Sequence, residues 1–409
     1  MADGDADGSN GSAGTNGSNG SRGAGGSNGS HDSRGPDVSH DSRGPDVSRF
    51  GGRRLSDPGD ERRPAVTAPR PARRPTIADI AKRAGLTKAA VSFALNDQPG
   101  VSAATRERVL AIAREIGWQP NSAARALTDG RAGAFGLVID RPAGMLGVEP
   151  FFMQLVAGIQ GELAAARAAL LFTVAEDSAA EIELHRTWWA QRRVDGVLLV
   201  DLHVDDPRVP VLEELGLPAV VVGAPEGSGS LPSVSTDEAA SARAVVEHFA
   251  GLGHRRIGHV TGMADLWHTR LRNEALAEAA ARAGVESFSV AADYTAEAGA
   301  LATRRLLESA EGRRPTAVIY DNDLMAVSGL GEAQRMEVSV PGELAIAAWD
   351  DSVLCRLVNP PISALTHDVA AYGAHAARAL LERASGGDPG NRVEPAAVLS
   401  VRESSSLPR

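Results

Sequence analysis

The sequence is poor in cysteine and in long apolar runs, and both shortages narrow the class of protein. Cys355 is the single cysteine among 409 residues, so the chain can form no internal disulfide and no thiolate metal site. No stretch of about 18 apolar residues is present, which argues against a membrane span. The N-terminal MADGDADGSN lacks the basic start and apolar run of a secretory signal. We therefore expect a cytoplasmic protein.

The sequence also lacks the short motifs of common enzyme classes. It contains no GxxxxGK phosphate loop, no dinucleotide fingerprint after the first expected strand, no GxSxG elbow after an expected strand and no HExxH pair. His254 and His259 have no third ligand at a suitable spacing, which favours structural roles over a metal site. We predict no catalytic residue, no metal and no cofactor, although an enzyme stays the main competing class because α/β lobes can host catalysis.

Charge is distributed unevenly along the chain. The net charge of −10 would argue against a nucleic-acid partner, but it is an average over the whole chain. Residues 49–75 carry eight arginines against three carboxylates, an excess of five positive charges, and residues 75–131 carry eight basic against five acidic residues, an excess of three. This asymmetry suits a basic end that meets phosphates and an acidic body that does not, while the alternative is a solvated basic surface.

Composition divides the chain into zones. Residues 1–74 are rich in Gly, Ser, Asn, Asp and Pro with almost no apolar side chains, so we predict a disordered tail. Residues 75–119 show a compact helical pattern, and residues 120–132 form a short separate segment. From 133 to 409, apolar strands alternate with amphipathic helices, which predicts parallel α/β sheets.

The helical zone predicts a helix-turn-helix. Apolar residues at helical spacing form one stripe at Ile77, Ile80, Ala81 and Ala84, and Thr76 can cap this helix. Gly85 breaks it, Thr87 can cap a second helix, and a third begins at Ser102 and ends before Gly117. The second helix leaves four residues facing away from its apolar stripe, and these are the candidates for reading bases in the major groove: Lys88, Ala89, Ser92 and Phe93. The alternative is an ordinary three-helix bundle.

Residues 120–132 predict a hinge helix that is too short to form alone. Asn121 can cap it and Gly130 can end it, but an isolated helix of fewer than about 12 residues is marginal in water. DNA and a partner copy could supply the surface that it needs. Leu127 would then be an apolar wedge in the minor groove and Arg125 would neutralise phosphate. Alternatively, Leu127 is a core residue of a linker.

The run from Thr76 to Arg131 resembles the headpiece of the lactose-repressor (LacI/GalR) family almost end to end. The matching motifs are TIADIAKRAG, VSFALN and GVSAATRERVLAIAREIGWQPNSAARAL, followed by GAFGLVID. The resemblance implies a regulator, in most cases a repressor, that binds a near-palindromic operator as a homodimer, with a tetramer as the alternative. Its predicted DNA-contacting residues are Thr76, Thr87, Lys88, Ala89, Ser92, Phe93, Asn96, Asn121, Arg125 and Leu127. Phe93 departs from the family, which often has Arg there, and could read a thymine methyl or simply pack.

The core sequence predicts two α/β lobes with a ligand cleft between them. Two sets of strand-like runs, divided near residue 236, are followed by polar residues at the carboxyl ends of strands, where ligands bind in such folds. These candidates are Asp140, Asp237, Asp293, Asp321, Asn322, Asp323, Asp350 and Asp351. Some of them will only cap the next helix. A sugar or nucleoside would suit such groups.

The resemblance selects among these candidates and implies a small-molecule effector. PSVSTDEAASARAVVEHFAGLGHRRIGHVTG and AIAAWDD look like core segments of the family, which has a bilobal, periplasmic-binding-protein-like core. They imply effector contacts at Phe151, Phe152, Asp237, Arg272, Tyr294, Asn322 and Asp350. Two departures put the pocket chemistry in doubt, since Glu149 stands where Asn is usual and Ala275 where Gly is common. A transporter's solute-binding protein shares this architecture, but the helix-turn-helix opposes that alternative.

Three tryptophans complete the predictions for the core. Trp188 and Trp189 fall in an amphipathic helix, where we expect both to pack, and Trp349 could either line the pocket or fill the core.

Overall fold

A computed structural model describes residues 73–119, 130–141, 147, 149–223, 225–310 and 312–406. Nearly all of the predicted tail and most of the predicted hinge helix lie outside these ranges. The DNA-contacting roles of Asn121, Arg125 and Leu127 therefore stay predictions. Within the described ranges, no helix has the length and apolar character that a membrane span requires.

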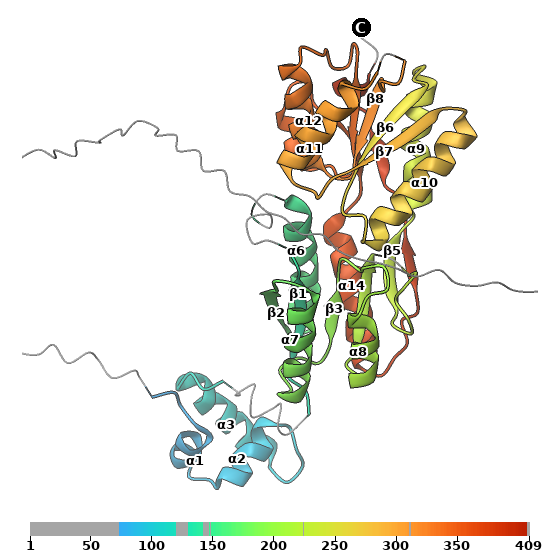
Figure 1. Ribbon diagram of the computed structural model, residues 1–409. Coiled ribbons are helices and arrows are strands. Elements are labelled where there is room, and N and C mark those ends of the chain that lie inside the picture. The colour runs from blue at the N-terminus through green and yellow to red at the C-terminus, as the bar shows by residue number, and fades with distance from the viewer. Residues whose placement is uncertain are drawn as a thin grey trace, which may run out of the picture. The chain divides into compact units, whose positions relative to one another are not determined.

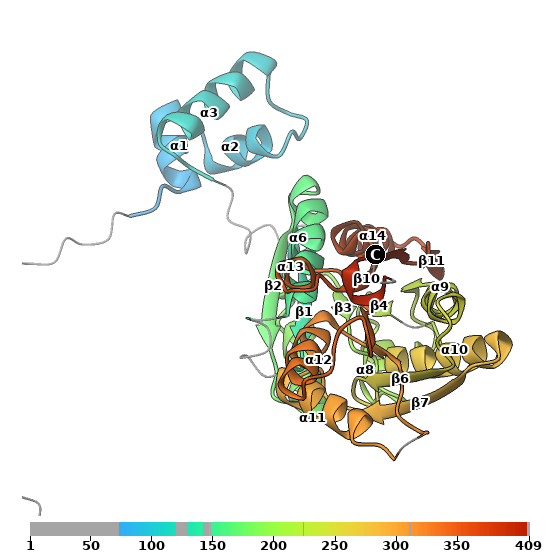
Figure 2. The same cartoon turned by 90° about the horizontal axis from the view of Figure 1, so that it is seen from above.

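Three helices form the headpiece around one small core (Figure 2). They are α1 (Ile77–Ala84), α2 (Lys88–Leu95) and α3 (Ala103–Glu115). The predicted starts are confirmed, since Oγ1 of Thr87 accepts from Ala90 N at 3.1 Å and Oγ of Ser102 accepts from Thr105 N at 3.3 Å. Gly85 ends α1 with φ +63°, a left-handed conformation that glycine adopts without strain. The predicted helix-turn-helix fold is confirmed.

The first core sheet has six parallel strands. In sheet order they are β11 (Arg392–Glu394), β5 (Ser233–Thr236), β4 (Ala219–Gly223), β3 (Val197–Leu199), β1 (Ala134–Ile139) and β2 (Ala169–Val174). One face is covered by α6 (Pro150–Ala165) and α14 (Val369–Ala384). The other face is covered by α7 (Ser178–Ala190) and α8 (Arg208–Leu215), whose apolar residues form a separate cluster. We call this sheet and its helices the first lobe (Figure 1).

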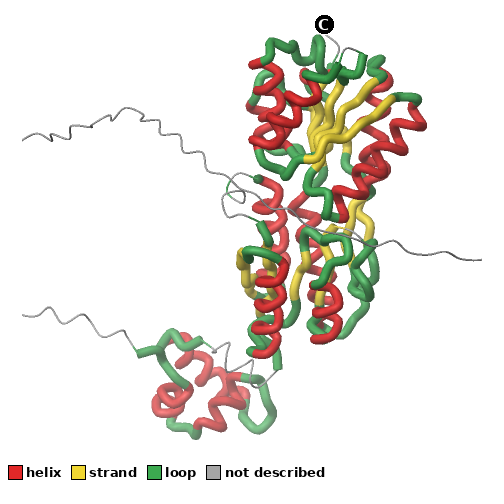
Figure 3. Tube along the Cα trace, viewed as in Figure 1, coloured by secondary structure: helices red, strands yellow, loops and turns green. Residues whose placement is uncertain are grey.

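The second sheet is also covered by helices on both faces, as Figure 3 shows. In sheet order its strands are β12 (Val398–Ser400), β10 (Ser363–Thr366), β9 (Ala345–Ala348), β8 (Ala317–Tyr320), β6 (Arg256–Thr261) and β7 (Glu286–Ala291). Its helices are α11 (Ala296–Leu307) and α12 (Asp323–Arg335) on one face, and α9 (Glu238–Gly251) and α10 (Trp267–Ala283) on the other. The short α13 (Val353–Leu357) and a 3-10 turn (Glu403–Ser405) complete this second lobe.

The structure confirms two lobes but corrects two details of the prediction. The division near residue 236 is incomplete, because α14 and β11 return from the C-terminal part of the chain to the first lobe. The second sheet is not wholly parallel, because β12 pairs antiparallel with β10. The strands β5, β10, β11 and β12 were not predicted, because none of them is a continuous apolar run, and no sequence pattern shows which lobe a helix will join.

The two adjacent tryptophans of α7 differ in their packing. Trp188 is buried against β1, where the position of a Cβ on Gly136 would lie 2.4 Å from the indole, so only glycine leaves room for the ring. Trp189 is 48% exposed, and the expectation that it packs was wrong. Consecutive helical residues point about 100° apart, so one face cannot bury both.

Candidate DNA-binding and effector sites

One face of α2 presents the predicted base-reading residues to solvent. Lys88 and Ala89 are exposed, Ser92 is half-buried and Phe93 is 42% exposed, while the opposite face is buried in the headpiece core. A large aromatic ring left open to solvent on a small domain is a feature that contact with a partner would explain. The outward face therefore has the geometry of a groove-binding helix.

The other predicted headpiece residues also have local structural contacts. The backbone N–H and hydroxyl of Thr76 donate to Oδ2 of Asp79 at 2.8 and 2.7 Å, which fixes the start of α1. Asn96 ends α2, and its Nδ2 donates to Oγ of Ser92 at 3.4 Å. These groups hold the helix ends, and Asn96 keeps a second amide N–H that can donate to a phosphate oxygen, whereas both donors of Thr76 are engaged by Asp79.

A cavity with an accessible volume of about 80 Å³ is lined by residues of both lobes, and its lining combines aromatic and polar side chains as small-molecule sites do. Five of the seven predicted effector residues line it, namely Phe151, Phe152, Arg272, Tyr294 and Asp350. The further polar and aromatic lining residues are Arg141, Glu149, Asp201, Thr236, Glu238, Ser241, His268, Asp321, Trp349, His367 and Tyr372.

Arg272 contacts three other lining residues at once. Its Nη1 donates to the carbonyl oxygen of Asp321 at 3.1 Å and its Nε to Oε2 of Glu238 at 3.3 Å. Its guanidinium lies 4.8 Å from the ring centroid of Trp349. The two alternatives for Trp349 are both realised, because its ring lines the cavity and belongs to the core of the second lobe.

Arg141 of the first lobe reaches the second lobe. Its Nε donates to Oδ2 of Asp201 at 2.8 Å, and its guanidinium lies 4.8 Å from the ring centroid of Tyr294. Burial opposes ionisation of Asp201, but the charge of Arg141 holds the pKa of this carboxyl below its usual value. The ion pair is therefore intact near neutral pH, with its cation facing a ring from the opposite lobe.

Tyr294 is held in an uncommon backbone conformation, with φ +71°. Its hydroxyl lies 2.7 Å from Nε2 of His268 and 2.9 Å from Oγ1 of Thr269, and its carbonyl accepts from Nδ2 of Asn322 at 3.1 Å. Burial lowers the pKa of His268 to about 4, so its imidazole is neutral at pH 7. These contacts stabilise a left-handed residue at the cavity wall.

Asp237 and Asn322 are not among the lining residues. Asp237 is exposed, and its Oδ1 accepts from Ala240 N at 2.9 Å as the cap of α9, while the next residue, Glu238, lines the cavity. Asn322 caps α12 through Met325 N at 2.9 Å and donates to the carbonyl oxygen of Tyr294 at 3.1 Å. Burial raises the pKa of Glu149, and a hydrogen bond from Asn322 offsets part of that rise. For these two residues, the helix-capping alternative describes the observed contacts.

Glu149 and Asp350 are lining carboxyl groups with incomplete hydrogen bonding. Oε2 of Glu149 and Oδ1 of Asp350 are buried and have no hydrogen-bond partner among the described residues. Burial raises the pKa of Glu149 to about 7 and that of Asp350 to about 8, and the nearby Arg141 and Arg272 respectively offset only part of the rise. Both carboxyls therefore titrate in the physiological range.

The remaining candidates have structural contacts. His259 Nε2 lies 2.7 Å from Oδ1 of Asp321, and His254 Nδ1 lies 2.9 Å from Oγ1 of Thr316. Within the ranges that the structure describes, no group of three or more His, Cys, Asp or Glu side chains could hold a metal ion. The sequence missed Arg141, Glu238 and His268 as cavity residues, although each lies on or just after a strand end or at a helix start, the positions where ligand residues gather.

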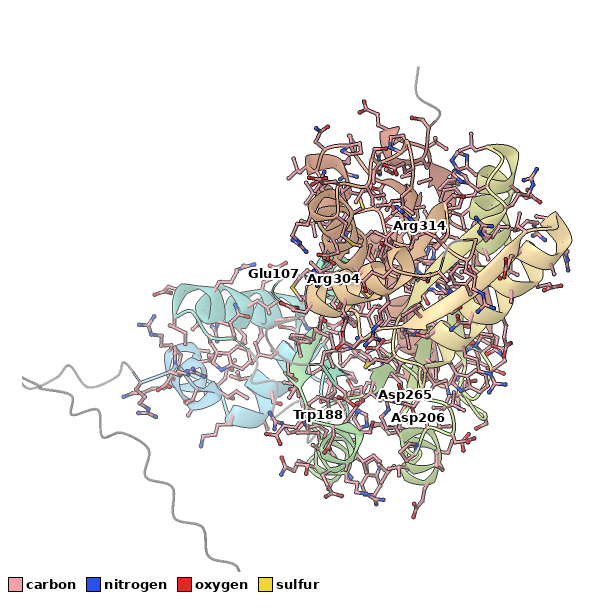
Figure 4. All side chains as sticks on the ribbon, turned by 45° about the horizontal axis from the view of Figure 1, so that its top comes forward. Glu107, Trp188, Asp206, Asp265, Arg304 and Arg314 are labelled. Atoms are coloured by element: carbon pink, nitrogen blue, oxygen red, sulfur yellow. The ribbon has the colours of Figure 1, made fainter. Side chains whose placement is uncertain are left out.

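The lobes also meet at the loops that follow β3 and β6. Nδ1 of His203 lies 3.0 Å from Oδ2 of Asp265, and the backbone N–H of Val204 donates to the carbonyl oxygen of Asp265 at 2.8 Å. The N–H of His203 donates to Oδ2 of Asp206 at 2.9 Å (Figure 4 labels Asp206 and Asp265). Any change in the angle between the lobes must change these contacts.

A helix-turn-helix headpiece joined to a two-lobed core with a polar cavity between the lobes defines the class of ligand-responsive transcriptional regulators. Residues 76–121 match the family model described as bacterial regulatory proteins, lacI family, and residues 246–405 match a periplasmic binding protein-like domain. The chain belongs to the lacI family and is a DNA-binding transcriptional regulator.

Three similar proteins cover between 67% and 81% of the chain. The transcriptional regulator CelR of Thermobifida fusca is 32% identical over 342 residues, which cover 81% of this chain and 98% of CelR. A lacI-family regulator from Bifidobacterium animalis subsp. lactis has a structure that is 33% identical, with a TM-score of 0.62, covering 67% of this chain and 98% of that one. The structure of a CelR–cellobiose complex is 30% identical, with a TM-score of 0.63, covering 81% and 100%.

Proposed function

We propose that this regulator represses transcription by binding a near-palindromic operator as a homodimer, and that a small polar ligand in the cavity controls its affinity for DNA. The observation that supports this most directly is the cavity that is lined by both lobes and contains a few convergent polar groups. A sugar or related metabolite fits this lining, and the similar CelR structure is titled as a complex with cellobiose. Effector contacts are assigned to Phe151, Phe152, Arg272, Tyr294 and Asp350.

The domain roles follow from this proposal. The headpiece at 75–119 reads bases with the outward face of α2, the segment at 120–132 is a hinge helix, and residues 133–409 bind effector and form the dimer. We assign no catalytic activity, cofactor or metal to the chain. Since its partner is DNA, we place it in the cytoplasm.

The proposed mechanism is a shift between two populations of the core. A ligand that contacts both lobes favours the closed arrangement in proportion to its extra affinity for that arrangement. Asp195 lies where the hinge joins the first lobe, and its carboxylate accepts from the backbone N–H groups of Ala132 and Gly133 at 2.6 and 2.7 Å. Because of these two hydrogen bonds, a rotation of the first lobe would also move the residues where the hinge segment joins it. The spacing of the two headpieces in a dimer would then change.

The proposal is tested by selecting binding sites from a random DNA pool with the full-length protein. We expect a recovered site with two related half-sites, and binding to it that changes when cellobiose or another sugar is added. Lys88→Ala should weaken binding to the recovered site, whereas Lys82→Ala, a change of another exposed lysine on α1, should have less effect. Recovery of unrelated sequences would contradict specific recognition.

The hinge is tested at Leu127. If this residue is a minor-groove wedge, Leu127→Ala should weaken binding to the recovered site by at least about tenfold while leaving non-specific DNA binding nearly unchanged, because only the specific complex bends DNA around the wedge. Both affinities are measured by fluorescence anisotropy at one salt concentration. An equal loss on both kinds of DNA would count against the wedge.

A further inference from the structure

A second hollow lies at the end of the first lobe that points away from the second lobe (Figure 1). Most of its lining residues directly precede strands β1 to β4 or directly follow helices α6, α7, α8 and α14, so they gather at the amino edge of the parallel sheet. Its accessible volume is about 930 Å³. We call it the basal groove, and the lining residues that matter for its chemistry are Arg131, Arg167, Trp189, Arg192, Asp195 and Leu217.

The charge that lines the basal groove is mostly positive. Arg131, Arg167 and Arg192 are exposed, and none of them has an ion-pair partner among the described residues. The carboxylate of Asp195 is already engaged, because it accepts from the backbone N–H groups of Ala132 and Gly133 at 2.6 and 2.7 Å. A concave surface lined by charge of one sign concentrates counter-ions, so this groove attracts anions.

Helix termination does not account for the arginines that follow α6 and α7. Arg167 and Arg192 adopt the left-handed conformation, with φ +57° and +51°, whereas α8 ends at the same edge with glycine, at Gly216. An arginine after a helix can donate to its last carbonyl groups, as Nη1 of Arg255 does to the oxygen of Ala250 at 3.0 Å. Within the described contacts, neither Arg167 nor Arg192 makes such a bond, so both guanidinium groups keep their donors for a ligand.

An aromatic ring and an apolar floor lie beside this charge. Trp189 is 48% exposed, lines the groove and comes three residues before Arg192. Leu217 and Phe135 are buried side chains of the same lining. An exposed indole offers a flat face on which a planar ring can stack, and guanidinium groups bind phosphate through paired N–H donors. The groove therefore suits a ligand that has both a planar ring and phosphate groups.

We propose that the basal groove binds a nucleoside phosphate, with the three arginines at the phosphate groups and Trp189 at the base, and that this ligand is a second effector of DNA binding. The groove shares no lining residue with the cavity between the lobes. Arg131 and Gly133 line it where the chain enters the first lobe from the hinge segment, so a bound ligand would contact that entry point. The effector role rests on the proposed function of the hinge, whereas the binding site does not.

A free nucleotide fits the groove better than the backbone of DNA does. The phosphates of a duplex could meet the arginines, but its paired bases are stacked inside the helix and would leave the indole of Trp189 unused. A nucleotide offers both groups in one small molecule.

The ligand class is tested by calorimetry with the full-length protein in the absence of DNA and of divalent cations. The probes are ADP and UDP, their nucleosides adenosine and uridine, and pyrophosphate. We expect at least one nucleotide to bind at least about tenfold more tightly than its nucleoside and than pyrophosphate, because only the nucleotide engages arginine and indole together. Its affinity should fall as salt is added. The proposal is overturned if neither nucleotide binds, or if pyrophosphate binds as tightly as the better nucleotide.

The site is tested with variants that keep the local backbone. Asparagine tolerates the left-handed conformation, so the double variant Arg167→Asn, Arg192→Asn should melt near the wild-type temperature and bind the nucleotide at least about tenfold more weakly. Trp189→Leu should weaken nucleotide binding while leaving pyrophosphate affinity within about twofold. Arg313→Asn, a change of an exposed arginine in a turn of the second lobe, is the matched control. Wild-type nucleotide affinity in the double variant would overturn the assignment of the groove.

The effector role is tested by anisotropy titrations of the operator with and without the nucleotide. We expect operator affinity to change by at least about threefold, and the double variant to lose this change while it still responds to the sugar bound between the lobes. If the nucleotide binds but operator affinity is unchanged, the effector role is wrong.

Two further outcomes separate this inference from its alternatives. If no nucleotide binds and the double variant lowers the slope of log affinity against log salt for DNA by about one or more, the arginines contact DNA phosphates and the proposal is overturned. If no nucleotide binds but a sugar still changes operator affinity, the inference fails and the proposed function stands.

Discussion

Arg272 is the side chain on which most of the cavity polarity depends. It neutralises Glu238, donates to the carbonyl oxygen of Asp321 and covers the ring of Trp349. Removal of the guanidinium would leave the Glu238 carboxylate without its ion-pair partner and the Trp349 ring without its cation–π contact. The ligand would also lose a hydrogen-bond donor. A guanidinium with several simultaneous partners cannot be replaced by a shorter side chain.

We therefore expect Arg272→Ala to abolish the response of DNA binding to ligand while leaving affinity for the operator within about threefold of the wild type. Anisotropy titrations with and without ligand measure both effects, and a melting curve checks that the core is folded. Arg270→Ala, on the same helix but with an exposed side chain paired to Glu274, is the matched control. A normal ligand response in the Arg272 variant would remove this residue from the effector site.

Strand ends and the family resemblance each predicted part of the cavity. The polar residues after strands included Asp321 and Asp350, the resemblance added Phe151, Phe152, Arg272 and Tyr294, and the structure brings these six together. Arg141 and His268 could not be recognised, because an arginine after a strand and a histidine early in a helix are common in any α/β protein. Their importance arises from contacts across the lobes, which local sequence does not encode.

At the scale of elements, α6 and α14 approach each other through glycine. A Cβ on Gly158 would lie 1.8 Å from the carbonyl oxygen of Ala370, and one on Gly373 would lie 2.3 Å from that of Leu155. Backbone therefore packs against backbone where the two helices cross, which no larger residue permits. This contact lets α14, which comes from the C-terminal part of the chain, pack closely against α6 of the first lobe.

We expect Gly158→Ala to destabilise the protein by about 1 to 3 kcal/mol, because the added methyl group must push α14 away. Gly161→Ala lies one turn further along the same helix, where a Cβ meets no atom within 4 Å, and should raise stability by up to about 1 kcal/mol. Urea unfolding of both variants provides the comparison. Equal changes in the unfolding free energy of the two variants would mean that the close approach of α6 and α14 does not restrict the residue at position 158.

Elements were predictable in proportion to the regularity of their apolar pattern. The headpiece helices and the continuous apolar strands followed from apolar spacing and capping residues. The strands β5, β10, β11 and β12 were missed, because none of them is a continuous apolar run as the equally short β3, β8 and β9 are. Their positions are set by the neighbours with which they pair.

At the scale of the whole molecule, the first lobe is built from two distant parts of the chain. Tyr372 of α14 donates from its hydroxyl to the carbonyl oxygen of Val234 at 2.8 Å, and β11 pairs with β5 at the edge of the sheet. Without α14, one face of the sheet would expose the buried residues of α6 and β4 to water.

A fragment of residues 130–237 should therefore fail to fold, whereas the same fragment joined to residues 367–396 by a flexible linker should show a cooperative melt. Circular dichroism during heating distinguishes the two, because loss of structure in a folded lobe is sigmoidal. The control is residues 130–237 joined by the same linker to an unrelated polar peptide with the length of residues 367–396. A cooperative melt of residues 130–237 alone would show that the C-terminal segment is dispensable for this lobe.

The chain crosses between the two sheets three times, at residue 237, at residues 367–368 and at residues 395–397. Tethers this short permit the lobes to rotate but oppose sliding or separation. A ligand enclosed by both lobes can then leave only during the same rotation that would reposition the headpieces. The residence time of the ligand would thus set the fastest rate at which a promoter could be switched back, however quickly the external concentration falls.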